Sequence, residues 1–164
     1  MNAKEIKEIS KDAEKSYRYA ANVLQKPFPK GEAVIATSAE YSFYYASDVL
    51  DAPFPKGEAA IATDAECSYR YARNVLKEPF FLGEEAIARQ AEYSYNYAMD
   101  VLNKPFPLGE AAIATSAEYS CSYAIDVLKA PFRLGEAQIF KSKPKYNYYI
   151  KFFPIKKRPA FFKY

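Results

Sequence analysis

The sequence predicts an all-α protein: five 26-residue helical-hairpin repeats stacked as a short α-solenoid, with an N-terminal capping helix and an irregular C-terminal tail. One segment recurs at a strict spacing of 26 residues without insertion or deletion, which is typical of stacked helical units. Apolar residues within it follow three- and four-residue steps, as on one face of a helix. Each copy carries one glycine and one Pro-Phe pair at fixed positions. The copies span residues 13–38, 39–64, 65–90, 91–116 and 117–140.

Residues 1–12 are predicted to form the capping helix. The segment Lys4–Ser10 aligns with the second, shorter helix of a repeat, and Ile9 takes the place of Ile35. Repeat arrays need atypical ends because the terminal units lack a neighbour on one side. We therefore expect one short helix to cover the first repeat.

The second copy illustrates the long helix of the hairpin. Thr37 or Ser38 can cap its start, and Thr37 with Glu40 has the spacing of a capping box. The helix must end before Pro53, because the residue that precedes a proline is disfavoured in helical conformation. We therefore predict a long helix that begins near residue 39 and ends shortly before residue 53.

The remainder of the hairpin is a stiff connector followed by a short helix. We expect Phe54 to fill the space between helices, and a short helix over residues 58–62 with Gly57 near its start. Ile61 is expected to face inward, and Glu58 in the first turn meets the positive end of the helix dipole.

Small residues on the long helix predict how the units pack. Every copy has a serine three positions after its first alanine and a second alanine four positions later, which together form a smooth groove for a closely packed helix. A recurring tyrosine, Tyr45 in the second copy, adds bulk beside this groove, and we expect its hydroxyl to find a backbone partner. A 26-residue hairpin cannot bury both of its faces alone, so the units must stack.

Charge divides the chain into two parts. Residues 1–140 hold 15 basic and 20 acidic residues, a net charge of −5, whereas residues 141–164 hold eight basic residues and no acidic one. This tail is also rich in aromatic residues, and its stretch YNYYIKFF favours a short strand or an extended arm, while three prolines argue against a long helix. Its candidate contact residues are Lys151, Lys156, Lys157 and Arg158.

Three interpretations of the tail remain open. It can be a degenerate sixth unit whose aromatic side chains cap the core. It can bind nucleic acid, with lysines on phosphates and aromatic rings stacked on bases. It can also dock on an acidic protein surface, including the second repeat of another copy, whose net charge is −4. Such self-association through the tail would not close on itself and would build a filament.

Nothing in the sequence indicates an enzyme, a cofactor or a metal site. The chain has no histidine, and its two cysteines, Cys67 and Cys121, replace aromatic residues at two different repeat positions. Phosphate-binding, dinucleotide-binding and nucleophile-elbow motifs are absent from the sequence. One glutamate opens each long helix, and helix capping explains all five copies without a ligand. We therefore predict a non-enzymatic protein.

Repeat positions that vary between copies mark the predicted partner-binding surface, because packing does not dictate their identity. Tyrosine, arginine and methionine at such positions are frequent in interface hot spots. The candidates for contact with a protein partner are Arg18, Tyr41, Tyr44, Arg70, Arg73, Tyr93, Met99 and Tyr119. The alternatives are nucleic-acid binding through residues 141–164 and a sponge for a small anionic ligand such as a nucleotide, held by Arg18, Arg70 and Arg73 at helix N-termini.

The unit YYASDVLDAPFPKGEAAIA resembles short helical tandem repeats of phage and bacterial proteins and, more loosely, the tetratricopeptide and Sel1-like αα repeats. This resemblance covers residues 13–140 and carries over no functional residue. It implies a small accessory protein that sequesters a host or viral protein, as a counter-defence factor does. We expect a cytoplasmic protein, in the host cytoplasm if it is phage-encoded, without a membrane span.

Overall fold

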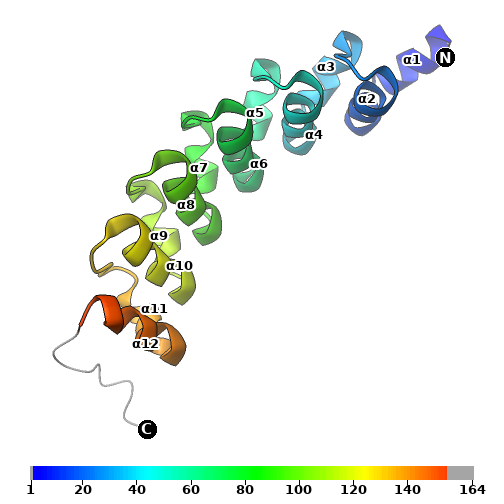
Figure 1. Ribbon diagram of the computed structural model, residues 1–164. Helices are drawn as coiled ribbons and strands as arrows, with labels where there is room; N and C mark the ends of the chain where they lie inside the picture. Colours follow the sequence, from blue (N-terminus) through cyan, green and yellow to red (C-terminus); the bar gives the residue numbers. More distant parts are fainter. Residues whose placement is uncertain (1, 155–164) are drawn as a thin grey trace. The chain divides into compact units, whose positions relative to one another are not determined.

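A computed structural model describes residues 2–154, and all regular structure within this range is helical (Figure 1). By internal packing the chain divides into two units, Met1–Ala86 and Ile87–Tyr164. The prediction of an all-α protein built from repeated helical hairpins, packed one on the next as in a solenoid, is confirmed.

Unit 1 contains the capping helix and three hairpins. Helix α1 spans Ala3–Ile9. The long helices α2, α4 and α6 lie side by side (Figure 1) and span Ala13–Arg18, Ala39–Tyr44 and Ala65–Arg70. Each continues as a π-helical segment over Tyr19–Leu24, Tyr45–Leu50 and Tyr71–Leu76. The short helices are α3 (Pro29–Ile35), α5 (Glu58–Ile61) and α7 (Glu84–Ile87), the last of which ends one residue beyond the boundary of unit 1. The 3-10 turns over Pro55–Gly57 and Phe81–Gly83 precede α5 and α7.

Unit 2 repeats this pattern. Its long helices are α8 (Ala91–Tyr97), continued by a π-helical segment over Ala98–Leu102, and α10 (Ala117–Ser122), continued over Tyr123–Leu128. A 3-10 turn over Pro107–Gly109 leads into α9 (Glu110–Ile113). The chain continues through α11 (Glu136–Lys141) and α12 (Lys143–Phe152).

Side chains immediately before the long helices cap α2, α4, α6 and α10, whereas Gln90 makes no such bond to α8. Ser38 caps α4, its Oγ accepting the backbone N–H of Tyr41 at 3.4 Å, and Asp64 caps α6 by accepting that of Cys67 at 2.8 Å. The capping box predicted for Thr37 is wrong, because the Thr37 Oγ1 instead donates to the carbonyl of Val34 at 2.7 Å.

The π-helical second half of each long helix was not predicted. The wider turn lets a carbonyl accept from five residues on, as where the Ala46 oxygen accepts the Asp51 N–H. The same oxygen also accepts the Ala52 N–H at 3.3 Å, beyond the end of the helix. A residue in left-handed conformation then ends each helix: Gln25, Asp51, Lys77, Asn103 and Lys129, with φ from 46° to 57°. Glycine usually fills such a position, so the turn is reached here at a conformational cost.

The serine of the predicted small-residue groove lies against the glycine of the short helix in the same hairpin, a contact that was not predicted. A Cβ built on Gly57 would lie 2.5 Å from the Phe54 ring and 2.6 Å from the Ser42 side chain, so only glycine fits between them. The Ser42 Oγ also donates to the carbonyl of Ile35 in the preceding hairpin at 2.9 Å. Ser16 makes the same bond to Ile9, which confirms that α1 stands in for a short helix.

The recurring tyrosine links successive hairpins through its hydroxyl. The Tyr71 hydroxyl accepts the backbone N–H of Phe54 at 2.9 Å and donates to the Glu58 carboxylate at 2.9 Å, so the expected backbone partner is confirmed. Phe54 is buried as predicted, with its ring centroid 5.1 Å from that of Tyr45, and Ile61 is fully buried. Glu58 is therefore a hydrogen-bond acceptor for the next hairpin as well as a first-turn acidic residue.

The expected strand or extended arm near residues 146–153 is wrong, because α12 covers most of this segment. Pro144 lies in the first turn of α12, where a proline is tolerated, and Pro154 follows its end. Tyr149 occupies the repeat position of Tyr123: it is fully buried, and its hydroxyl accepts the Phe132 N–H at 3.1 Å. Of the three interpretations of the tail, the degenerate sixth unit describes residues 143–153.

Candidate partner-binding surface

Neither the acidic side chains nor the cysteines of the described residues form a cluster of metal ligands. No group of three or more acidic or cysteine side chains lies within reach of a common metal ion in this range. Burial, together with hydrogen bonding to Asp64, raises the pKa of the Cys67 thiol to about 12. Burial likewise raises the pKa of the Cys121 thiol. Both thiols are therefore protonated at neutral pH and poorly nucleophilic.

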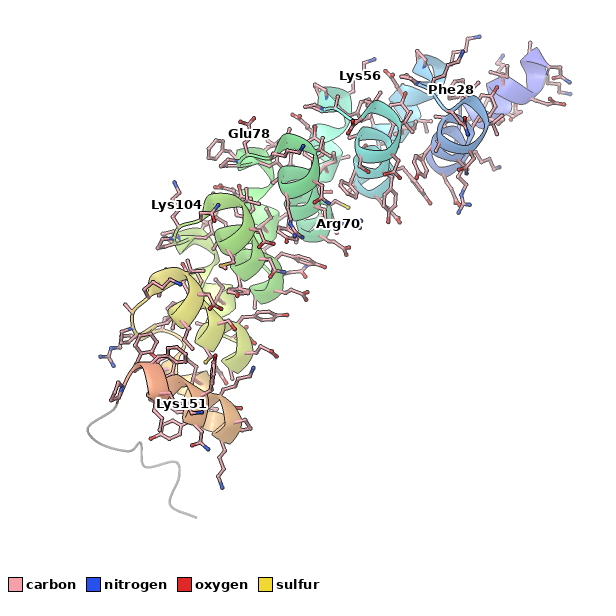
Figure 2. The ribbon with its side chains drawn as sticks, in the orientation of Figure 1. Phe28, Lys56, Arg70, Glu78, Lys104 and Lys151 are labelled. Atoms are coloured by element: carbon pink, nitrogen blue, oxygen red, sulfur yellow. The ribbon has the colours of Figure 1, made fainter. Side chains whose placement is uncertain are left out.

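In unit 1 the structure brings several predicted contact residues together. The rings of Tyr41 and Tyr44 lie 5.9 Å and 5.7 Å from that of Tyr17, between centroids. The Arg70 guanidinium lies 4.6 Å from the Phe43 ring centroid and 5.7 Å from that of Tyr44. We call Tyr17, Tyr41, Tyr44 and Arg70 the aromatic–arginine cluster. Arg70 projects from the side of the hairpins opposite to Lys56 and Glu78 (Figure 2).

Hydrogen bonds fix the orientation of this cluster. The Tyr17 hydroxyl donates to the Asp48 carboxylate at 2.7 Å, and burial together with this bond raises the pKa of Tyr17 to about 12. Arg70 pairs with Glu66 on its own helix at 3.2 Å. Neither Tyr17 nor Asp48 is among the contact residues predicted from the sequence. They lie 31 residues apart, one repeat plus five positions, so comparing neighbouring repeats could have paired them.

The other predicted arginines lie outside this cluster. Arg18 is exposed and pairs with Glu14 at 2.8 Å, while the guanidinium of Arg73 lies 5.9 Å from the ring centroid of Tyr69. Each arginine already has a carboxylate or aromatic partner within its own hairpin. The structure therefore does not gather Arg18, Arg70 and Arg73 into one anion-binding site.

Unit 2 carries a smaller version of the same surface. Tyr119 lies 5.9 Å from Tyr95 between ring centroids, and the Tyr95 hydroxyl donates to Asp126 at 2.9 Å. Met99 is 42% exposed and lines a shallow pocket of about 200 Å³ with Asp126. Tyr93 is half-buried on α8.

A hollow of about 390 Å³ lies between α4 and α6 in unit 1, beside the aromatic–arginine cluster. Phe43 and Cys67, both buried, form its floor, and Tyr44 and Arg70 stand at its sides. Exposed carboxylates of Glu40, Asp64 and Glu66 complete its lining. Its volume lies at the lower end of the range for ligand pockets.

The tail contributes less to a binding surface than its composition predicts. Lys151 is exposed on α12 (Figure 2), whereas Lys145 pairs with Glu118 of α10 at 3.1 Å. The predicted contacts Lys156, Lys157 and Arg158 lie outside the described residues.

The chain matches no family model, and the searches of curated proteins and of solved structures found no significant match. Among the described helices none has the length and apolar character needed to cross a lipid bilayer.

Proposed function

We propose that the protein is a non-enzymatic repeat protein that acts by binding another protein. Its contact surface is the outer face of the long helices, centred on the aromatic–arginine cluster. One observation carries the proposal: half-buried tyrosines and an arginine, the residue types that dominate interface energetics, gather on one face of consecutive helices.

The arrangement of these side chains favours tight association. Binding normally costs about 0.5–1.5 kcal/mol for each side chain that becomes immobilised. Tyr17 is already held by Asp48, and Arg70 by Glu66 and by the ring of Phe43. These side chains are therefore already ordered in the free protein, so little further side-chain entropy is lost when a partner binds.

The resemblance to phage and bacterial repeats gives this proposal a specific form. The partner is a host or viral protein in the cytoplasm of the cell, and sequestering it is the biological action. Nucleic-acid binding through residues 141–164 is the competing hypothesis, and the experiment below tests the contribution of the last ten of these residues.

Affinity capture from nuclease-treated lysate, with identification by mass spectrometry, tests the proposal. Full-length protein is compared with Tyr44→Ala/Arg70→Ala, with Lys56→Ala and with a chain that ends at residue 154. Lys56 is the matched control, since it is exposed and lies on the opposite side of the same unit. Circular dichroism establishes that every variant is folded. Truncation after residue 140 is unsuitable because it removes α12, which packs on α10 and α11.

We expect one stoichiometric protein to be retained by the full-length chain, by Lys56→Ala and by the shortened chain, and to be lost from the double variant. If the double variant retains it, the aromatic–arginine cluster is not the contact surface. If removing the last ten residues abolishes capture, or if the protein is captured only from lysate that has not been treated with nuclease, the nucleic-acid hypothesis replaces the proposal.

A further inference from the structure

One exposed position of the repeat changes from lysine to leucine along the chain. It precedes the glycine of each copy, and its occupants are Lys30, Lys56, Leu82, Leu108 and Leu134. All five residues are exposed, and the leucines are between 55% and 59% exposed. Because lysine occupies the same position in two copies, the packing of the hairpin does not require leucine there.

Leucine at this position gives up a contact within the fold. Lys56 donates to the Glu32 carboxylate of the preceding hairpin at 2.7 Å, 24 residues back along the chain. The same count from Leu134 leads to Glu110, to which leucine offers no charge. A single exposed leucine is ordinary on a protein surface, but the same exchange in consecutive copies indicates contact with something outside the chain.

Basic residues accompany the two leucines of unit 2. The turns over residues 103–108 and 129–134 hold three exposed basic residues and no acidic one, although residues 1–140 as a whole carry a net charge of −5. One of the three, Lys104, is drawn in Figure 2. Another, Arg133, is bonded to Glu136 at 3.0 Å, so the two lysines carry most of the net charge. The basic residues and the leucines together form the turn edge of unit 2: Lys104, Leu108, Lys129, Arg133 and Leu134.

The repetition of this edge favours a flat and chemically uniform partner. Because α8 and α10 pack on each other, equivalent positions in the two turns lie about one helix diameter apart, roughly 10 Å. Leu108 and Leu134 can therefore reach one plane together, each beside a lysine. A protein partner must present the same acidic and apolar combination twice at this spacing, whereas an anionic bilayer offers charged headgroups above apolar chains at every point.

We propose that the turn edge of unit 2 binds the surface of an anionic lipid bilayer. The side chains of Leu108 and Leu134 enter the boundary between headgroups and acyl chains, while Lys104 and Lys129 lie against the headgroup charges. This inference goes beyond the proposed function and does not depend on it. The aromatic–arginine cluster contacts a protein, and the turn edge holds the chain at a membrane surface.

Tryptophan fluorescence tests the insertion directly. The chain has no tryptophan, so Leu134→Trp places a single reporter on the turn edge, and Lys11→Trp places one on an exposed turn of unit 1. The full-length variants are mixed with vesicles in which about one lipid in three is phosphatidylserine and the rest is phosphatidylcholine. We expect the emission of Leu134→Trp to move to shorter wavelength and to be quenched by brominated lipid, while that of Lys11→Trp stays unchanged.

Sedimentation with the same vesicles measures what the leucines contribute. Leu108→Gln/Leu134→Gln should fold, because a polar side chain already occupies this position as Lys30 and Lys56. Glutamine does not enter the apolar boundary, so binding should weaken about tenfold or more. Circular dichroism establishes that the variant keeps its helices.

The lysines are tested with a control that changes the net charge equally. Lys104→Gln/Lys129→Gln should weaken binding about twentyfold, at about fivefold for each charge, and this loss should shrink at high salt. Lys11→Gln/Arg18→Gln removes two exposed basic side chains elsewhere and should stay within about twofold of the natural chain. Vesicles of phosphatidylcholine alone should bind the natural chain about tenfold more weakly or less still.

The proposal is overturned if the vesicles do not bind the protein, if both tryptophan reporters respond alike, or if the leucine variant binds as tightly as the natural chain. In the last case the basic residues of the chain adsorb to the lipid without insertion. If the natural chain instead binds soluble polyglutamate, and loses it in the same variants while vesicles are not bound, the turn edge contacts an acidic protein. None of these outcomes involves Tyr44→Ala/Arg70→Ala, so failure of the membrane contact is distinguishable from failure of the proposed protein-binding function.

Discussion

The contact between Gly57 and Ser42 allows a sharp test of how the hairpins are held together. The test is the substitution Gly57→Ala, which adds a single methyl group. Gly57 has φ −94°, a conformation that alanine adopts freely, so backbone strain plays no part. On propensity alone, the change should stabilise the folded chain by about 0.5–1 kcal/mol, because glycine loses more conformational entropy on folding.

Steric crowding acts in the opposite direction, and the structure indicates that it is the larger effect. The added Cβ would lie 2.5 Å from Phe54 Cδ1 and 2.6 Å from both Cβ and Oγ of Ser42. Neither neighbour can move away easily, since Phe54 is 3% exposed and the Ser42 Oγ is bonded to the Ile35 carbonyl at 2.9 Å. Overpacking of this kind typically costs about 1–3 kcal/mol. We therefore expect a net loss of about 1–2 kcal/mol in the free energy of unfolding.

Urea unfolding followed by circular dichroism measures this difference. Lys56→Ala is the matched control, because Lys56 is exposed in the same 3-10 turn, and its partner Glu32, which is 14% exposed, keeps the hydrogen bond from the Tyr45 hydroxyl. The control should therefore lose less than about 1 kcal/mol relative to the natural chain. If Gly57→Ala is as stable as this control, or more stable, the close approach of the short helix to Ser42 does not limit packing, and the reasoning fails.

Three further predictions concern the tyrosines and the helix ends. Tyr71→Phe removes the acceptor of a buried Phe54 N–H, so we expect a loss of about 1–3 kcal/mol in urea unfolding; unchanged stability would contradict that role. Burial raises the pKa of Tyr45 from 10.0 to about 12, so the folded chain holds this proton more tightly than the unfolded chain. The contribution of this proton to stability is complete below about pH 10 and is lost as the pH rises toward 12. Over this range the urea concentration at the midpoint of unfolding should fall while the absorbance of phenolate grows. The fall should be less steep in Tyr45→Phe. Lys129 has φ 54°, so Lys129→Gly should raise the melting temperature and Lys129→Val should lower it, whereas the reverse order would argue against the left-handed conformation.

The hairpins could be predicted from the sequence because the same residues recur at the same positions in five copies. A glycine and a serine that recur 15 residues apart, as Gly57 and Ser42 do, have a packing reason that a single copy would not reveal. The recurrence of the tyrosine likewise predicted that its hydroxyl has a backbone hydrogen-bond partner. In each case the invariance within one chain replaces the information that a set of related sequences normally supplies.

The π-helical segments could not be found in this way. The residues that end them in left-handed conformation include Gln25, Asp51 and Lys77, which share neither side-chain shape nor charge. The wide turn is defined by backbone hydrogen bonds, such as the one from the Asp51 N–H to the Ala46 carbonyl. Side-chain periodicity does not report which of these bonds forms.

The error over the tail has a different cause. Local β-propensity of the stretch YNYYIKFF favoured an extended arm, whereas the repeat register places Tyr149 26 residues after Tyr123, in a fully buried position. Tertiary packing decides between these signals, because β-propensity reflects the fit to a sheet surface that this chain does not offer within the described residues. Extending the register by one unit would have predicted α12.

The same logic explains where function can reside in a chain of near-identical units. Positions that hold the array together are repeated, and a change at any of them disturbs two neighbouring hairpins, as the double role of the Tyr71 hydroxyl shows. Specific recognition needs a place that differs from its copies. Cys67 is such a departure, because Tyr41 and Tyr119 stand at its repeat position and a hollow of about 390 Å³ lies beside the smaller side chain. A partner that distinguishes one unit from another must contact positions of this kind, since the repeated positions look alike in every copy.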